Sequence, residues 1–112
     1  MNSEDKYPEI AKGLLEKTRQ RKAQWDDEPL GGGFSLKLKN STIRIKFLSP
    51  PTEADSITLV FMNEEGREVD TWTVQDGDLH WDLAKDLYRQ IVKNVAGWDK
   101  VMGDIEAFLK SG

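Results

Sequence analysis

The sequence predicts an α+β protein in which a four-stranded antiparallel meander packs against an N-terminal helix and a long C-terminal helix, in the order α-β-β-β-β-α. Three observations predict this fold. Both ends of the chain repeat apolar residues at helical spacing, the middle alternates apolar and polar residues, and turn-forming residues separate the alternating segments. The 112 residues have the length of one ordinary domain, so residues 1–112 are expected to form a single domain.

The first helix is expected between about Pro8 and Gln24. Pro8 suits a first helical position, where its missing N–H costs nothing. Acidic residues precede the segment and basic residues lie near its end, as the helix macrodipole favours. We expect Trp25 to close the apolar face and residues 26–33 to form a flexible connector. The apolar face consists of Ile10, Ala11, Leu14, Leu15 and Thr18.

The four strands are expected as two hairpins. The first covers residues 34–39 and 42–47 and turns at Asn40-Ser41. A segment with two prolines then forms a surface loop. The second hairpin pairs Ile57–Met62 with Glu68–Val74 and turns at residues 63–66. Because consecutive strands tend to be neighbours, the expected order is 1-2-3-4.

The last segment repeats apolar residues at alternating intervals of four and three, which is an unbroken heptad seam. Asp78 suits the N-cap. A continuous helix from Leu79 to Lys110 would be about 48 Å long, whereas a six-residue strand spans only about 20 Å. Gly97 and Gly103 are the two positions where this helix is most easily divided. The seam residues are Ala84, Tyr88, Ile91, Val95, Trp98, Met102, Ile105 and Leu109.

The composition excludes several classes of function. The chain has no cysteine, which removes disulfides, thiolate metal sites and cysteine nucleophiles, and it has one histidine, His80. The net charge of −4 disfavours indiscriminate binding of polyanions. The N-terminus is acidic where a signal peptide would be basic, and the longest apolar run has four residues. We therefore expect a cytoplasmic protein without a membrane partner, metal or cofactor.

Three short motifs follow one another along the chain. They are Leu14-Leu15-Glu16-Lys17-Thr18 leading to Trp25, Asn63-Glu64-Glu65-Gly66 in the sheet, and Leu87-Tyr88 in the last helix. Together they resemble small uncharacterised bacterial proteins with a helix, a four-strand meander and a helix. The resemblance covers most of the chain and implies no established activity, so it carries over no functional residue. In topology only, the four strands and the following helix resemble the repeats of Pur-alpha-like and Whirly single-strand nucleic-acid binders, and such an analogy does not establish function.

The polar face of the first hairpin carries four cations and no acid: Lys37, Lys39, Arg44 and Lys46. Such a row can follow a phosphate backbone. Lys and Arg on an exposed sheet face also keep it soluble and protect an edge strand from pairing. A single-strand binder usually adds aromatic rings for base stacking, whereas the aromatic residues of this hairpin lie on the opposite face. The sequence therefore favours the solubility interpretation.

The third strand has apolar residues on both faces. Val60 and Met62 lie opposite Ile57, Leu59 and Phe61, and Trp72 in the next strand is expected to join Val60 and Met62. A strand of this kind is covered on both sides. We expect the first helix to cover the Val60 face, with an interface as the alternative.

Two further clusters favour structural interpretations. Residues 76–82 hold three aspartates and His80, but a calcium loop would need a bidentate glutamate where Leu87 stands. An aspartate-rich helix N-terminus explains this cluster. The glycines at 31–33 precede a strand and lack the Lys-Ser/Thr of a phosphate-binding loop, so they indicate a connector.

These observations predict a non-enzymatic interaction module, a homodimer whose ligand the sequence does not identify. The alternative is a single-stranded nucleic-acid-binding protein that uses Lys37, Lys39, Arg44 and Lys46. A third hypothesis is an enzyme centred on His80 with Asp78 or Asp82, but the sequence identifies no nucleophile or partner for that histidine.

The dimer interface is expected on the distal part of the last helix. A helix with an apolar stripe must bury it, and the sheet is too short to cover the whole stripe. We expect each distal helix to lie on its partner in a two-fold dimer. The competing account breaks the helix near Gly97 and folds its distal part back onto the core of the same chain. The expected interface residues are Trp98, Met102, Ile105, Phe108 and Leu109.

Overall fold

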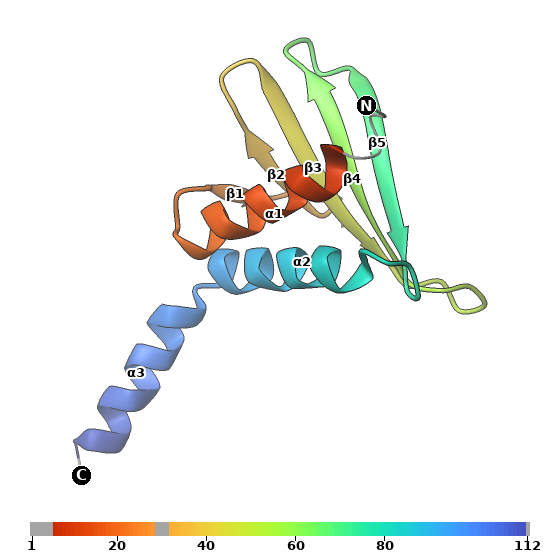
Figure 1. Cartoon of the computed structure of the whole chain (residues 1–112). Helices are drawn as coiled ribbons and strands as arrows, with labels where there is room; N and C mark the ends of the chain where they lie inside the picture. The colour runs from red at the N-terminus through yellow and green to blue at the C-terminus, as the bar shows by residue number, and fades with distance from the viewer. Residues whose placement is uncertain (1–5, 29–31, 112) are drawn as a thin grey trace.

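A computed structural model of the chain describes residues 6–28 and 32–111, which form three helices and a five-stranded antiparallel sheet (Figure 1). The α+β class is thereby confirmed. The elements are, in order, α1 (Lys6–Arg19), β1 (Trp25–Asp27), β2 (Phe34–Lys37), β3 (Ser41–Leu48), β4 (Ser56–Asn63), β5 (Glu68–Gln75), α2 (Trp81–Val95) and α3 (Trp98–Lys110).

The prediction of four strands was wrong by one strand, because β1 lies where a flexible connector was expected. β1 pairs antiparallel with β2, with Trp25 opposite Leu36. The indole N–H of Trp25 donates to the Thr18 hydroxyl at 3.0 Å, which anchors the strand to α1. Only one of the three β1 residues is apolar, so the sequence of this strand shows no alternation of apolar and polar residues from which a strand could be predicted. Residues 29–31 of the expected connector lie outside the described residues.

The sheet order is β1-β2-β3-β4-β5, a meander that contains the four expected strands in the expected order. The first predicted turn was one residue late, since the Leu38 N–H donates to the Ser41 carbonyl and Lys39-Asn40 form the loop. The second turn lies at residues 63–66, as expected. There the side-chain oxygen of Asn63 accepts from the N–H groups of Glu65 and Arg67, at 3.1 and 2.9 Å.

Both α1 and α2 pack on the same face of the sheet (Figure 1). The core lies between this face and the two helices, where Ala11 of α1 and Leu87 of α2 are fully buried against Ile45 of β3. The expectation that the first helix covers the Val60 face was therefore wrong. The apolar stripe of α1 packs on the sheet face that carries isoleucine and leucine side chains. Packing there buries more apolar surface than packing on the opposite, more polar face would.

The expected long C-terminal helix is divided at Gly97. Its φ of +72° is left-handed, and the N–H groups of Ala96 and Gly97 donate to the carbonyls of Val92 and Asn94, which ends α2. Gly103 lies inside α3, which is continuous. α3 projects from the body, and none of its residues is buried (Figure 1). The competing account, in which the distal part folds back onto the core of the same chain, is therefore wrong.

The projecting helix gives the molecule an elongated shape. The radius of gyration is 15.9 Å and the longest extent is 57 Å, whereas a compact domain of this length has a radius of gyration of about 13 Å. Within residues 6–28 and 32–111, no helix has the length and apolar character needed to cross a membrane.

Candidate interaction surfaces

The first candidate surface is the apolar stripe of α3, which we call the α3 stripe. Its residues recur at intervals of three and four and so share one helix face. Phe108 is 77% exposed, Leu109 71% and Ile105 45%. All five predicted interface residues belong to this stripe, which Val101 extends. The stripe consists of Trp98, Val101, Met102, Ile105, Phe108 and Leu109.

The first turn of α3 is tied to the body of the protein. Asp99 forms an ion pair with Arg21, which follows α1. The Lys93 ammonium of α2 lies 5.5 Å from the centre of the Trp98 ring, within the range of a cation–π contact. The sequence pattern did not reveal these two contacts, because they join residues of different elements. They hold the start of α3 while its distal turns project.

Acidic residues border the α3 stripe on both sides. At about 100° per residue, Glu106 and Asp99 follow the stripe on one side and Asp104 follows it on the other. Lys100 and Lys110 lie further round, toward the back of the helix. A surface that complements the α3 stripe should therefore be apolar at its centre and basic at its rim.

The second candidate surface is the sheet face turned away from α1 and α2, which we call the open face. No helix of the described residues packs on it. The pairing register places Val60 and Met62 of β4 there, opposite Thr71 and Thr42 respectively. Trp72 pairs with Leu59 and so lies on the helix-covered face, where it packs against the core. The prediction that it joins Val60 was wrong.

Three of the four predicted basic residues share the open face. Lys37 lies opposite Thr42, Arg44 opposite Ser35, and Lys46 opposite Thr58. These pairs put all three cations on the same side as Val60 and Met62. Lys39 lies in the turn between β2 and β3 instead.

An acid also reaches the basic residues, which the sequence pattern did not reveal. Glu28, directly after β1, lies 3.7 Å from the Arg44 guanidinium. The Nε of Arg44 is buried and has no hydrogen-bond partner among the described residues. Glu28 lies outside the predicted hairpin, and only the formation of β1 brings it to Arg44.

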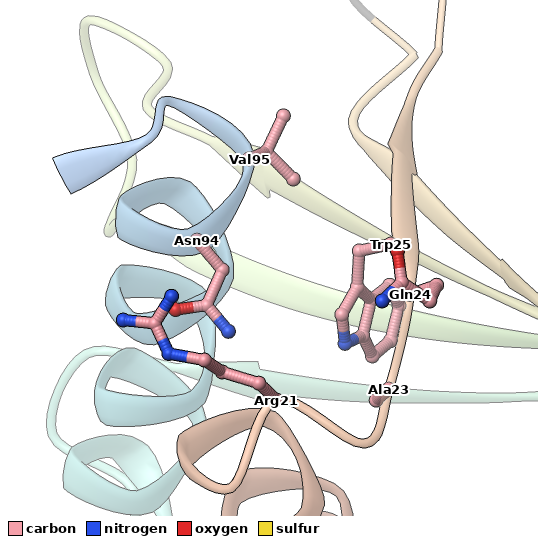
Figure 2. A pocket seen from close by; sticks show the side chains of 6 residues that line it. All are labelled: Arg21, Ala23, Gln24, Trp25, Asn94 and Val95. Atoms are coloured by element: carbon pink, nitrogen blue, oxygen red, sulfur yellow. The ribbon is translucent and has the colours of Figure 1, made fainter. Parts of the chain in front are cut away.

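A small pocket lies where the end of α1, β1 and the end of α2 meet (Figure 2). Its volume is about 190 Å³, below the roughly 300–1,000 Å³ of ordinary small-molecule sites. Its main polar groups already have partners. The Asn94 amide donates to the Thr18 carbonyl at 2.7 Å, and Arg21 pairs with Asp99. Figure 2 shows the Arg21 and Asn94 side chains on one side of the pocket and Trp25 on the other.

A larger hollow of about 420 Å³ lies between the β3–β4 end of the sheet and α2. Its aromatic wall is Tyr88, whose ring centre lies 5.4 Å from that of Phe47. Burial, and to a lesser extent the negative charge of Asp27, raise the pKa of Tyr88 above its usual value of 10.0. The phenol is therefore neutral at neutral pH and can donate a hydrogen bond. The lining residues are Phe47, Asp55, Asp76, Trp81, Lys85, Tyr88 and Arg89.

The cluster of aspartates around His80 forms a turn before α2. The helix begins at Trp81, with His80 at the N-cap and without a side-chain cap hydrogen bond. The Asp78 carboxylate accepts from the Gln75 N–H at 2.8 Å, so the prediction of Asp78 as the N-cap was wrong. Within the described residues, no three His, Cys, Asp or Glu side chains come together as a metal site would require.

No protein-family model, no curated protein and no solved structure matches this chain.

Proposed function

We propose that this protein is a non-enzymatic interaction module that works as a homodimer in the cytoplasm, with the α3 stripe as its docking element. The observation that carries this proposal is that α3 exposes five large apolar side chains, leaves Met102 half-buried and buries none of its residues. Burial of a large apolar side chain stabilises by roughly 1.5–3 kcal/mol, so a few such side chains together outweigh the cost of association.

The charges beside the stripe favour a protein partner over a membrane surface. Helices that lie in a membrane interface usually carry Lys and Arg beside their apolar face, because lipid surfaces are anionic. Asp99, Asp104 and Glu106 border the α3 stripe instead. A second copy of the chain is the simplest protein partner, since a two-fold dimer closes with one kind of interface.

Sedimentation equilibrium tests this proposal. We expect the wild-type chain at micromolar concentration to approach twice its monomer mass of 12.8 kDa. Ile105→Asp places a carboxylate at the centre of the α3 stripe and should return the chain to the monomer mass. Ala107→Asp is the matched control, because Ala107 lies on the opposite face of the same helix. A wild-type mass that stays at that of the monomer up to high micromolar concentration would refute the homodimer.

The second candidate function is binding of single-stranded nucleic acid on the open face. One observation favours it: Lys37, Arg44 and Lys46 share a face that no described helix covers. Two observations weaken it. Glu28 offsets the charge of Arg44, and Phe34 and Phe47 lie near Tyr88 of α2 and not beside the cations.

A fluorescence titration with a labelled single-stranded oligonucleotide tests this candidate. Counterion release makes such binding weaken steeply with salt, so affinity should fall between 50 and 200 mM salt, on the order of tenfold or more. Lys37→Glu/Lys46→Glu should abolish the binding, whereas Lys22→Glu, on the exposed turn after α1, should preserve most of it. Absence of binding at the lower salt concentration rejects the candidate.

A further inference from the structure

Two surfaces of this protein lack a covering element within the described chain, and they complement each other. One is the α3 stripe and the other is the open face. We propose that α3 of each copy lies on the open face of the other copy, in a reciprocal two-fold exchange. This inference rests on the proposed homodimer and names the surface that the docking helix contacts.

The connection between α2 and α3 keeps α3 away from the open face of its own chain. α2 packs on the opposite face of the sheet, and only two residues, Ala96 and Gly97, join α2 to α3. The Arg21–Asp99 ion pair holds the first turn of α3 beside the end of α1, also on the helix side of the sheet. The projecting part of α3 can therefore reach such a face only on another molecule (Figure 1).

The two surfaces match in length and in the position of their apolar groups. α3 has 13 residues, which make a helix about 20 Å long. β4 has eight residues, which span about 26 Å. Val60 and Met62 lie on β4, between β3 and the edge strand β5; Val60 is only 9% exposed, so the partly exposed Met62 is the main apolar contact that the two residues offer. Thr42 and Thr71 are neighbours across the strands and add methyl groups to this surface, whereas Arg44 pairs with Val60 and Glu68 pairs with Met62.

The charges of the two surfaces also match. Asp104 and Glu106 border the α3 stripe and form no ion pair within the described residues. Lys37 and Lys46, which border the apolar centre of the open face on the β2–β3 side, form none either. Contact between the two surfaces brings carboxylates next to ammonium groups, which steers association and sets orientation.

The buried area favours this arrangement over pairing of α3 with α3. The partly exposed side chains of one stripe have on the order of 500 Å² to bury, since a phenylalanine or tryptophan buries about 150–250 Å² and the aliphatic side chains add smaller areas. Pairing two stripes would bury only about 1,000 Å² in total, below the roughly 1,200–2,000 Å² of stable interfaces. A stripe on a sheet buries a comparable area of the sheet as well, so two reciprocal contacts bury about 2,000 Å².

Intermolecular nuclear Overhauser effects in a dimer of one isotope-labelled and one unlabelled full-length chain test the arrangement directly. The expected result is contacts from the Val60 and Met62 methyl groups of the labelled copy to Ile105, Phe108 or Leu109 of the unlabelled copy. Contacts from the α3 stripe only to the other α3 stripe would overturn the inference but would leave the homodimer standing.

Charge reversal gives a second, independent readout by sedimentation equilibrium. Lys37→Glu/Lys46→Glu should raise the dimer dissociation constant at least about tenfold at low salt, and adding Asp104→Lys/Glu106→Lys should restore most of the lost affinity. Lys22→Glu controls for the change of charge alone, and circular dichroism verifies that each variant is folded. Suppose that Ile105→Asp dissociates the dimer but Lys37→Glu/Lys46→Glu leaves its dissociation constant within twofold of the wild-type value. This result would overturn the inference and leave the homodimer standing. A monomeric wild-type chain overturns the inference and the homodimer together.

Discussion

Two glycines of this protein share a backbone conformation and differ in their surroundings. Gly33 has φ +86° and Gly66 has φ +82°, both in the left-handed region that favours glycine. A Cβ atom at Gly33 would lie 2.0 Å from the carbonyl oxygen of Ile45, whereas nothing lies within 4 Å of a Cβ atom at Gly66. Glycine is therefore required at position 33 because the backbone there packs closely against the backbone of Ile45. At position 66 glycine is favoured only by the left-handed conformation of the turn.

We expect Gly33→Ala to destabilise the protein far more than Gly66→Ala does. Gly66→Ala should lower the free energy of unfolding by about 1–2 kcal/mol, the cost of a left-handed alanine. Gly33→Ala adds a steric clash that only movement of β3 can relieve, so a loss of about 3 kcal/mol or more is expected. Urea denaturation of the two variants measures the difference, and equal losses would contradict the packing at Gly33.

The buried hydroxyl of Thr18 links α1 to β1. It donates to the Leu14 carbonyl at 2.6 Å and accepts from the Trp25 indole at 3.0 Å. Thr18→Val keeps the volume but leaves the indole N–H without its acceptor, so a loss of about 1–3 kcal/mol in unfolding free energy is expected. Thr52→Val, at an exposed position of the loop before β4, is the control and should change stability by no more than about 0.5 kcal/mol. Similar losses for both variants, measured by urea denaturation, would contradict this role of Thr18.

A contact between α1 and the edge strand β5 makes stability depend on pH. The Tyr7 hydroxyl donates to the Asp70 carboxylate, and this bond, together with the Thr71 N–H, lowers the pKa of Asp70 below its usual value of 3.8. A lowered pKa stabilises the folded state at higher pH, and this contribution is lost as pH falls through 3.8 toward the lower folded-state pKa. Thermal unfolding from pH 6 to pH 2 should show a smaller loss of stability for Asp70→Asn than for wild type. An identical loss would contradict the contact.

At the scale of elements, the break between α2 and α3 decides the shape of the C-terminal part. Gly97 and Gly103 have the same intrinsic helix propensity, yet the chain leaves the helix only at Gly97. The reason is the cap: the left-handed Gly97 lets backbone N–H groups bond to carbonyls in the last turn of α2. Gly103 forms no such cap and remains helical.

Alanine substitutions should therefore act with opposite sign at two glycines. Gly97→Ala places a side chain at φ +72° and should lower the free energy of unfolding by about 1 kcal/mol. Gly13→Ala, in the exposed interior of α1 with nothing within 4 Å of the new Cβ atom, should raise it by about 0.5–1 kcal/mol. Chemical denaturation followed by circular dichroism checks both, and stabilisation by Gly97→Ala would contradict the cap.

At the scale of the whole molecule, association should contribute to thermal stability. A partner that binds only the folded state stabilises it by mass action, so the midpoint of a dimer rises with protein concentration. We expect the thermal midpoint of the wild-type chain to rise by several degrees over a hundredfold increase in concentration, on the scale at which about 1 kcal/mol shifts a midpoint by 4–8 °C. Ile105→Asp should remove this dependence and Ala107→Asp should retain it. A concentration-independent wild type would contradict the dimer.

The amino-acid sequence alone determined the α+β class, the four longest strands, their order and the apolar stripe at the C-terminal end. Each depends on a period of two or 3.6 residues, and a period is a local property of the chain. The shared face of Lys37, Arg44 and Lys46 follows from the same alternation.

The tertiary structure alone decided which sheet face α1 covers, whether β1 forms, and where Glu28 and Asp99 find their partners. A period distinguishes the two faces of a strand but does not say which face a distant helix will bury, so Trp72 and Val60 could not be assigned correctly. β1 is too short to have a period and exists because Trp25 bonds to Thr18 and pairs with β2. These outcomes depend on the free energy of contacts between segments far apart in the chain, which no local pattern contains.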